Sequence, residues 1–212
     1  MDEKEREYFQ NARMPQGEAG QRMLATMNQG THARLAEWAF SCCHPQPGDW
    51  ALDVGCGGGA NLKRLLAFCS EGNVIGVDHS PTSVEASRQL CAEERAAERC
   101  SVLLGSAVRL PVVDGCLDLV TAFETVYFWG NLEQAFAEVR RVLAPGGTFM
   151  ICNEVDGTHE EDFRMVSVIE GMTVHTPYQV GSALARAGFT LESTEHKPGE
   201  GWVAYIARKP QD

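Results

Sequence analysis

"ALDVGCGGGA", residues 51–60, joins an apolar run to four glycines and places one acid, Asp53, just ahead of them. Short apolar runs of this kind form buried strands, and glycines directly after a strand allow a tight turn into a helix. Such a turn presents backbone N–H groups at a helix N-terminus, where a ligand can approach the backbone closely. The stretch therefore predicts a strand, a ligand-binding glycine turn and a helix.

Downstream of this turn, apolar runs alternate with amphipathic helical patterns. The runs after "WALDV" are "NVIGVD" (73–78), "SVLLG" (101–105), "LDLVTAF" (117–123) and "TFMICN" (148–153). This alternation predicts a mostly parallel sheet with helices on both faces, because right-handed crossovers place the helices outside the sheet. We therefore expect an α/β fold with a single doubly wound, mostly parallel, seven-stranded sheet.

The C-terminal third completes the expected sheet. "PGG" at 145–147 predicts a turn into the fifth strand, and a capping box at 176–179 predicts the start of the last helix. Two strand-like runs then follow, at 189–195 and 202–208, with no helix between them. Because strands joined by a short loop pair in opposite directions, these two runs predict a C-terminal antiparallel hairpin at one edge.

Capping residues predict where two earlier helices begin. Thr31 is placed to cap a helix that runs to Cys43. Ser80 followed by Pro81 has the residue types of an N-cap and a first helical position, for a helix that ends at about Arg99.

Length and composition predict one globular domain. The chain has 212 residues, and domains commonly hold roughly 100–200. We expect residues 1–46 to form a helical lead-in that packs on a domain of residues 47–212. The net charge of −11 disfavours nucleic acid as a partner. Neither a signal peptide nor an apolar stretch of about 20 residues is evident, so no membrane association and a cytoplasmic location are expected.

The cysteines do not predict a metal site. Eight cysteines are present, without a CxxC pair or a Cys/His cluster at the spacing of zinc ligands. Free thiols packed as small apolar side chains are expected instead, and no metal is predicted.

The glycine turn by itself leaves its ligand open. Gly55 to Ala60 also fits the dinucleotide-binding pattern G-x-G-x-x-G/A. Asp78 follows Gly55 by 23 residues, a spacing that also suits the ribose-binding acid of dinucleotide-binding proteins. A nicotinamide-dependent oxidoreductase is therefore one interpretation of the turn.

Residues 50–208 resemble the class I S-adenosylmethionine-dependent methyltransferases, with the size of a small bacterial-type member. "LDVGCGGG" resembles the first motif of that family. An acid at the position of Asp53 is characteristic of that motif, and dinucleotide-binding proteins usually lack an acid there. "GSAVRLP", "CLDLVTAFETV", "EVRRVLAPGG" and "LARAGF" resemble the later motifs, in the same order. The resemblance implies a Rossmann-like sheet closed by the reversed hairpin, with S-adenosylmethionine as cofactor and S-adenosylhomocysteine as product.

The resemblance also implies which residues bind the cofactor. The carboxylate of Asp78 would bind the ribose hydroxyls and His79 would lie against the adenine. At 106 the family usually has an acid for the adenine amino group, whereas this chain has Ser106, a neutral hydrogen-bonding group. The implied cofactor-binding set is Asn28, Asp53, Gly55, Cys56, Gly57, Asp78, His79, Ser106, Ala107 and Glu124.

The acceptor is expected at the carboxyl ends of the fourth and fifth strands, since ligands of open α/β sheets bind at that edge. Glu124 is the first candidate for contact with the methionine end of the cofactor or with the acceptor, and Glu154 is the second; both are candidate catalytic residues. The aromatic residues at 127–129 are candidates to wall the acceptor. Asn28 and His32 are candidates to close over the methionine moiety.

These features predict methyl transfer from S-adenosylmethionine to a small-molecule acceptor by in-line displacement. Asp53 and the lack of length for a second, substrate-binding domain count against the NAD-dependent oxidoreductase. The other alternative is a protein that binds S-adenosylmethionine without catalysis.

Overall fold

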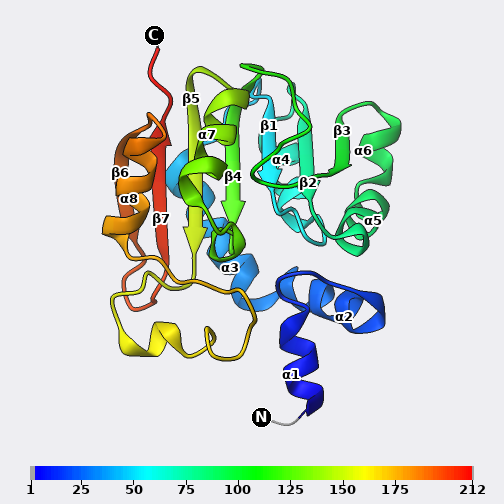
Figure 1. The fold of residues 1–212 in the computed structure, drawn as a ribbon. Helices are drawn as coiled ribbons and strands as arrows, with labels where there is room; N and C mark the ends of the chain where they lie inside the picture. The colour runs from blue at the N-terminus through cyan, green and yellow to red at the C-terminus, as the bar shows by residue number, and fades with distance from the viewer. Residues whose placement is uncertain (1–2, 212) are drawn as a thin grey trace.

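A seven-stranded sheet organises residues 3–211, the part of the chain that this computed structural model describes (Figure 1). The strands are β1 (Ala51–Val54), β2 (Val74–Asp78), β3 (Cys100–Leu104), β4 (Leu117–Phe123), β5 (Leu143–Asn153), β6 (Thr190–His196) and β7 (Val203–Arg208). Their spatial order is β3-β2-β1-β4-β5-β7-β6. The first five strands pair in parallel, and β7 is antiparallel to both β5 and β6. The predicted fold class, including the hairpin at one edge, is confirmed.

Helices cover both faces of the sheet and one of its ends. They are α1 (Glu3–Gln10), α2 (Gly17–Met27), α3 (Gly30–Cys43), α4 (Ala60–Phe68), α5 (Pro81–Leu90), α6 (Ala92–Ala96), α7 (Leu132–Val142) and α8 (Pro177–Arg186), with short 3₁₀ turns η1 (Val126–Phe128) and η2 (Glu160–Phe163). Among the helices of residues 3–211, none has both the length and the hydropathy that crossing a membrane requires.

Two hydrophobic cores lie on opposite faces of the sheet. One packs α7 and α8 against the sheet and includes Phe136 and Phe149. The other packs α3, α4 and α5 and includes Leu35 and Leu65. Strand β1 supplies residues to both cores, as expected for a central parallel strand whose two faces are buried.

Two predicted helix starts are confirmed by their capping hydrogen bonds. The Ser80 hydroxyl accepts a bond from the Ser83 N–H at 3.2 Å, ahead of α5. The Thr176 hydroxyl accepts from the Gln179 N–H at 3.3 Å, and the Gln179 side chain accepts from the Thr176 N–H, which completes the predicted capping box of α8.

Two predicted helix boundaries are wrong. Thr31 is inside α3, which begins at Gly30 after the N-cap Gln29, because the positive φ of Gly30 lets the chain enter the helix two residues earlier. The helix predicted from Pro81 to about Arg99 is interrupted at Cys91, whose side chain is fully buried in the core under α4 and α5. The chain continues as the separate short helix α6.

The fifth strand also begins earlier than predicted. "PGG" at 145–147 is part of β5 rather than a turn that precedes it. The pairing of β5 with β4 shifts register between Leu117 and Leu119, and Gly146 has a φ of +78°. The glycine lets the strand bulge there and continue, instead of starting after the turn.

The N-terminal helices and the segment between β5 and α8 lie beyond the carboxyl ends of the parallel strands (Figure 1). The two parts contact each other through the Gln10 side chain: its amide nitrogen donates to the Val168 carbonyl, and its Oε1 accepts from the Glu170 N–H at 3.0 Å. This end of the sheet is therefore covered on two sides.

Candidate functional site

The glycine turn between β1 and α4 is built from left-handed backbone. Gly55, Gly57 and Gly59 have φ angles of +81°, +53° and +85°, which side chains with a Cβ adopt at a cost. A Cβ on Gly55 would also lie 2.3 Å from Cγ2 of Thr125. The Gly55 and Cys56 N–H groups donate to the Val77 carbonyl at 2.7 and 3.1 Å, which ties the turn to the end of β2.

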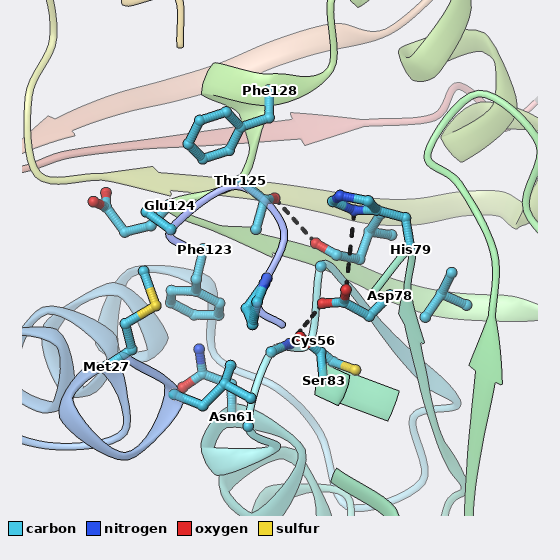
Figure 2. Close-up of a pocket in the computed structure, with 18 of the residues that line it drawn as sticks. Met27, Cys56, Asn61, Asp78, His79, Ser83, Phe123, Glu124, Thr125 and Phe128 are labelled. Atoms are coloured by element: carbon cyan, nitrogen blue, oxygen red, sulfur yellow. Dashed lines mark hydrogen bonds and ion pairs between the residues drawn. The ribbon is translucent and has the colours of Figure 1, made fainter. Parts of the chain in front are cut away.

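Asp78, the last residue of β2, holds the same turn through its side chain (Figure 2). One carboxylate oxygen accepts from the Gly57 N–H at 2.9 Å and the other accepts from the Ser80 N–H at 2.8 Å. The His79 ring nitrogen Nδ1 lies 3.9 Å from the carboxylate. Each oxygen keeps further acceptor capacity, so Asp78 can bind a ligand while it holds the turn.

A cavity of about 330 Å³ lies over the glycine turn, within the range of roughly 300–1,000 Å³ usual for small-molecule pockets. It brings most of the sequence-predicted site residues together. Those that line it are Asn28, Gly55, Cys56, Gly57, Asp78, His79, Ser106, Ala107 and Glu124, together with His32, Phe128 and Trp129. In Figure 2, Asp78 and His79 lie on one side of the site, and Glu124 and Met27 lie on the other.

Asp53 lies behind the turn and is not among the lining residues of the cavity. Its side chain is 2% exposed and accepts a hydrogen bond from the Thr121 hydroxyl at 2.7 Å. Burial raises the pKa of Asp53 to about 7, against the opposing effect of that hydrogen bond. The structure therefore places Asp53 within β1, hydrogen-bonded to β4, two residues ahead of the turn.

Glu124 directly follows β4 and has a φ of +59°, which is uncommon for a residue with a side chain. Its Oε1 accepts from the Tyr127 hydroxyl at 3.2 Å and from the backbone N–H of Glu154. Burial, followed by the neighbouring Glu154 carboxylate, raises the pKa of Glu124 to about 8. A carboxyl group that holds its proton near neutral pH can act as an acid or, once ionised, as a base.

Glu154 directly follows β5 and lies beside the cavity rather than among its lining residues. His32 comes from the first turn of α3. One ligand atom each of His32, Glu124 and Glu154 lies within 4.8 Å of the other two. Three elements far apart in the sequence thus bring an imidazole and two carboxyl groups together.

The aromatic residues at 127–129 divide between two roles. Phe128 and Trp129 line the cavity, whereas Tyr127 is buried and donates its hydroxyl to Glu124. The Val155 N–H donates in turn to the Tyr127 oxygen at 3.3 Å, so Tyr127 links the ends of β4 and β5. Burial raises the pKa of Tyr127, which keeps the hydroxyl protonated.

Several lining residues carry no sequence signal that would have predicted them. Arg13, Met27 and Arg64 line the cavity from the turn after α1, from α2 and from α4. Thr125 also lines it, packs against Gly55 and donates its hydroxyl to the Val54 carbonyl at 3.1 Å. Its position next to Glu124 is the one hint that the sequence offers.

Comparison with known proteins identifies methyltransferases. Residues 52–151 match the model of a family described as "Methyltransferase domain". An uncharacterized 37.1 kDa protein in transposon TN4556 of Streptomyces fradiae is 39% identical over 157 residues, which are 69% of this chain and 45% of that protein. The demethylmenaquinone methyltransferase of Symbiobacterium thermophilum is 37% identical over 112 residues, 52% of this chain and 44% of that protein.

The fold is also similar to a solved structure, a SAM-dependent methyltransferase from Aquifex aeolicus. The TM-score is 0.74 at 17% sequence identity, over 89% of this chain and 97% of that one. The chain spans less than half the length of the curated relatives named above. The matched region contains the glycine turn, Asp78 and Glu124 in one domain. Residues 52–151 therefore form a methyltransferase domain, and the chain has the class I, Rossmann-like fold of the S-adenosylmethionine-dependent methyltransferases.

Proposed function

We propose that this protein transfers the methyl group of S-adenosylmethionine to a small-molecule acceptor. The observation that carries the proposal is the cavity over the glycine turn, with the Asp78 carboxylate on one side and the Glu124 carboxyl on the other (Figure 2). A ligand that spans the cavity meets an acid at both ends and lies over the glycine turn. The family assignment supplies the chemical identity of that ligand.

The residues at the Asp78 end fit an adenosine group. The Asp78 carboxylate can accept hydrogen bonds from two ribose hydroxyls, and charge-assisted bonds of this kind are strong. His79 would lie against the adenine. The hydroxyl of Ser106 accepts weakly from the Val108 N–H at 3.4 Å, and so remains able to bond the ring, as does the N–H of Ala107.

The residues at the other end fit the methionine part of the cofactor. The Asn28 amide donates to the Gly58 carbonyl at 3.3 Å, which places Asn28 directly over the glycine turn. Glu124 lies across the cavity from Asp78 (Figure 2). When bound, S-adenosylmethionine supplies an electrophilic methyl group on a sulfonium sulfur. The cofactor-binding assignment of Asp53 is kept as an indirect one, through the hydrogen bond that ties β1 to β4 just ahead of the turn.

The protein's part in the reaction is to align the acceptor and to exclude water. In-line displacement depends on how well the nucleophile and the methyl group are positioned, and it needs no covalent catalyst. Phe128 and Trp129 provide an apolar wall at the acceptor end. Burial raises the pKa of Glu124 to about 8, so Glu124 can receive a proton from the acceptor once its carboxyl group is ionised.

The acceptor is proposed to be a small molecule. The Symbiobacterium thermophilum relative is named for demethylmenaquinone, a small molecule, although this chain spans 44% of that protein. The net charge of −11 disfavours a nucleic-acid acceptor, because it repels a phosphate backbone. No observation on the cavity favours the oxidoreductase alternative.

Calorimetric titration with S-adenosylmethionine, S-adenosylhomocysteine and NADH tests the cofactor. We expect both sulfur compounds to bind at micromolar concentration and NADH not to bind. Binding of NADH alone would overturn the proposal in favour of an oxidoreductase.

Catalysis is tested by incubating the protein and S-adenosylmethionine with representative phenols, amines, thiols and carboxylic acids, with S-adenosylhomocysteine release as the measurement. Release that depends on one acceptor class supports the proposal. Tight cofactor binding without release on any class would favour the protein that binds but does not catalyse.

A further inference from the structure

His32, Glu124 and Glu154 form a cluster that the fold assembles from the first turn of α3 and the carboxyl ends of β4 and β5. One ring nitrogen and two carboxylate oxygens of the cluster lie within 4.8 Å of one another. All three residues are partly buried, so these atoms are neither sealed in the core nor free in bulk water. The cluster is at the side of the cavity where the acceptor is expected.

The two carboxyl groups of this cluster have no permanent cation as a partner. Within residues 3–211, no lysine or arginine forms an ion pair with Glu124 or Glu154. Close carboxylates repel each other, and partial burial removes much of the water that would screen the repulsion. The third group of the cluster is the imidazole of His32, which is only a weak base. A bound cation would offset the repulsion.

Hydrogen bonds hold Glu124 in place and still leave one of its oxygens available. Oε1 accepts from the Tyr127 hydroxyl and the Glu154 N–H, and no hydrogen bond to Oε2 is found in the described part of the chain. The positive φ of Glu124, +59°, costs conformational energy that the surrounding contacts must offset. Hydrogen-bond partners such as the Tyr127 hydroxyl commonly orient the side chains that bind metal ions.

We propose that His32, Glu124 and Glu154 bind one divalent transition-metal ion, and that this ion holds the nucleophilic oxygen or nitrogen of the acceptor beside the methyl group. One imidazole nitrogen with two carboxylates suits Mn²⁺, Fe²⁺, Co²⁺ or Zn²⁺, whereas Mg²⁺ and Ca²⁺ prefer oxygen ligands throughout. Carboxyl groups lose their protons when they bind a metal ion, and two carboxylates then match the charge of a dication. Three protein ligands leave coordination positions open for water or an acceptor group, as in catalytic metal sites.

The metal site differs from the expectation of no metal drawn from the sequence. That expectation considered cysteine and histidine spacing, and these ligands have no local spacing, since each comes from a different element. The part assigned to the acceptor rests on the proposed function. Binding of the ion does not depend on it, and the two can be tested separately.

The first experiment measures metal binding on the full chain. Protein freed of metal with EDTA, and then of EDTA, is titrated with MnCl₂ while electron paramagnetic resonance reports free Mn²⁺; ZnCl₂ is titrated by calorimetry. We expect one equivalent of Mn²⁺ or Zn²⁺ to bind, and MgCl₂ to bind more weakly. Absence of binding by both transition-metal ions at millimolar concentration would overturn the proposal.

Variants then locate the bound ion. H32N and E154Q should each weaken binding by at least about tenfold, since each removes a ligand. The matched controls are H44N and E71Q, which alter an exposed histidine and an exposed glutamate elsewhere. His44 has a left-handed backbone, which asparagine tolerates well. Equal affinity in H32N, E154Q and the controls would assign the ion to the acidic surface and would refute the site.

S-adenosylhomocysteine binding, measured in EDTA on the same samples, separates the two proposals. Normal binding of S-adenosylhomocysteine without metal binding overturns the metal site alone, whereas loss of cofactor binding in the wild type overturns the proposed function. Circular dichroism checks that each variant is folded. If E154Q does not fold, E154D retains the charge but shortens the side chain, and it should weaken Mn²⁺ binding.

Discussion

At the scale of single residues, three acids near the glycine turn have different surroundings and therefore different properties. Asp53 is enclosed between β1 and β4, where burial raises its pKa to about 7. Glu124 is next to a second carboxyl group and has a pKa of about 8. Asp78 accepts two backbone N–H bonds and faces the cavity. The environment, rather than the residue type, makes these three acids differ.

Replacing Asp78 tests the ribose assignment. D78A should weaken S-adenosylhomocysteine binding by at least ~1.5 kcal/mol, because charge-assisted hydrogen bonds to the ligand are lost. Calorimetric titration measures the change, with E93A, an exposed acid on α6, as the control. D78A also removes the acceptor of the Gly57 N–H, so its unfolding must be followed in parallel. Unchanged affinity in a folded D78A would remove the assignment.

The buried carboxyl of Asp53 should make stability depend on pH. Its pKa is raised from 3.8 in the unfolded chain to about 7 in the folded protein, so between these values the folded state binds the extra proton. The contribution of Asp53 to the free energy of unfolding is fully present below about pH 4. It is lost as the pH rises to about 7, and the total loss is a few kcal/mol at most.

D53N, which cannot ionise and keeps an oxygen for the Thr121 hydroxyl, should remove that loss. Urea unfolding at pH 5 and pH 8 gives the measurement, with E71Q as the exposed control. We expect D53N to gain more stability relative to wild type at pH 8 than at pH 5. The same difference at both pH values would show that Asp53 does not titrate in this range.

At the scale of elements, the strands were predictable and some helix boundaries were not. Most strands are local apolar runs, although β6 (TLESTEH) is largely polar, and the starts of α5 and α8 carry capping residues whose hydrogen bonds form as expected. The break at Cys91 has no such signal, since no glycine or proline is near it and tertiary burial of Cys91 accompanies it. The start of α3 depends on the backbone of Gly30, which residue types alone did not indicate.

The glycine turn should tolerate no Cβ at Gly55. G55A combines an unfavourable positive φ with a clash against Thr125, whose Cγ2 would be 2.3 Å from the new Cβ. G30A is the matched control, because Gly30 also has a positive φ, +61°, but open space around its Cβ position.

We expect G30A to cost about 1 kcal/mol of folding free energy, and G55A to cost several times more and to weaken S-adenosylhomocysteine binding. Urea denaturation and calorimetry measure the two effects. Equal costs would mean that Thr125 moves aside without penalty, and that its contact with the turn does not position the site.

At the scale of the whole molecule, the site depends on how distant elements meet. The glycine turn and Asp78 were predictable, because a strand, a turn and an acid after the next strand are local features of the sequence. The cluster of His32, Glu124 and Glu154 was not, since it forms where α3 passes the ends of β4 and β5. Glu124 and Glu154 were candidates by position, but the sequence did not show that an imidazole from α3 would join them.

Ligand binding should stabilise the entire fold rather than one part of it. The cavity is lined by residues from α2, α3, α4, the ends of β1, β2 and β4, and η1. These elements belong to both hydrophobic cores, and α3 supplies Leu35 and Phe40 to one of them. A ligand that contacts all of them is therefore linked to global unfolding, so a single transition should shift as a whole.

S-adenosylhomocysteine at 100 times its dissociation constant adds about 2.7 kcal/mol to the stability of a protein that binds it only when folded. For a chain of this size, that corresponds to a rise in Tm of roughly 5–11 °C. Differential scanning calorimetry with S-adenosylhomocysteine, with NADH and without ligand measures it. A rise with NADH alone would contradict the cofactor assignment. The ligand could instead shift only one of two unfolding transitions. That result would mean that the N-terminal helices unfold separately, and that the part of the chain that closes the cavity is independent of the sheet.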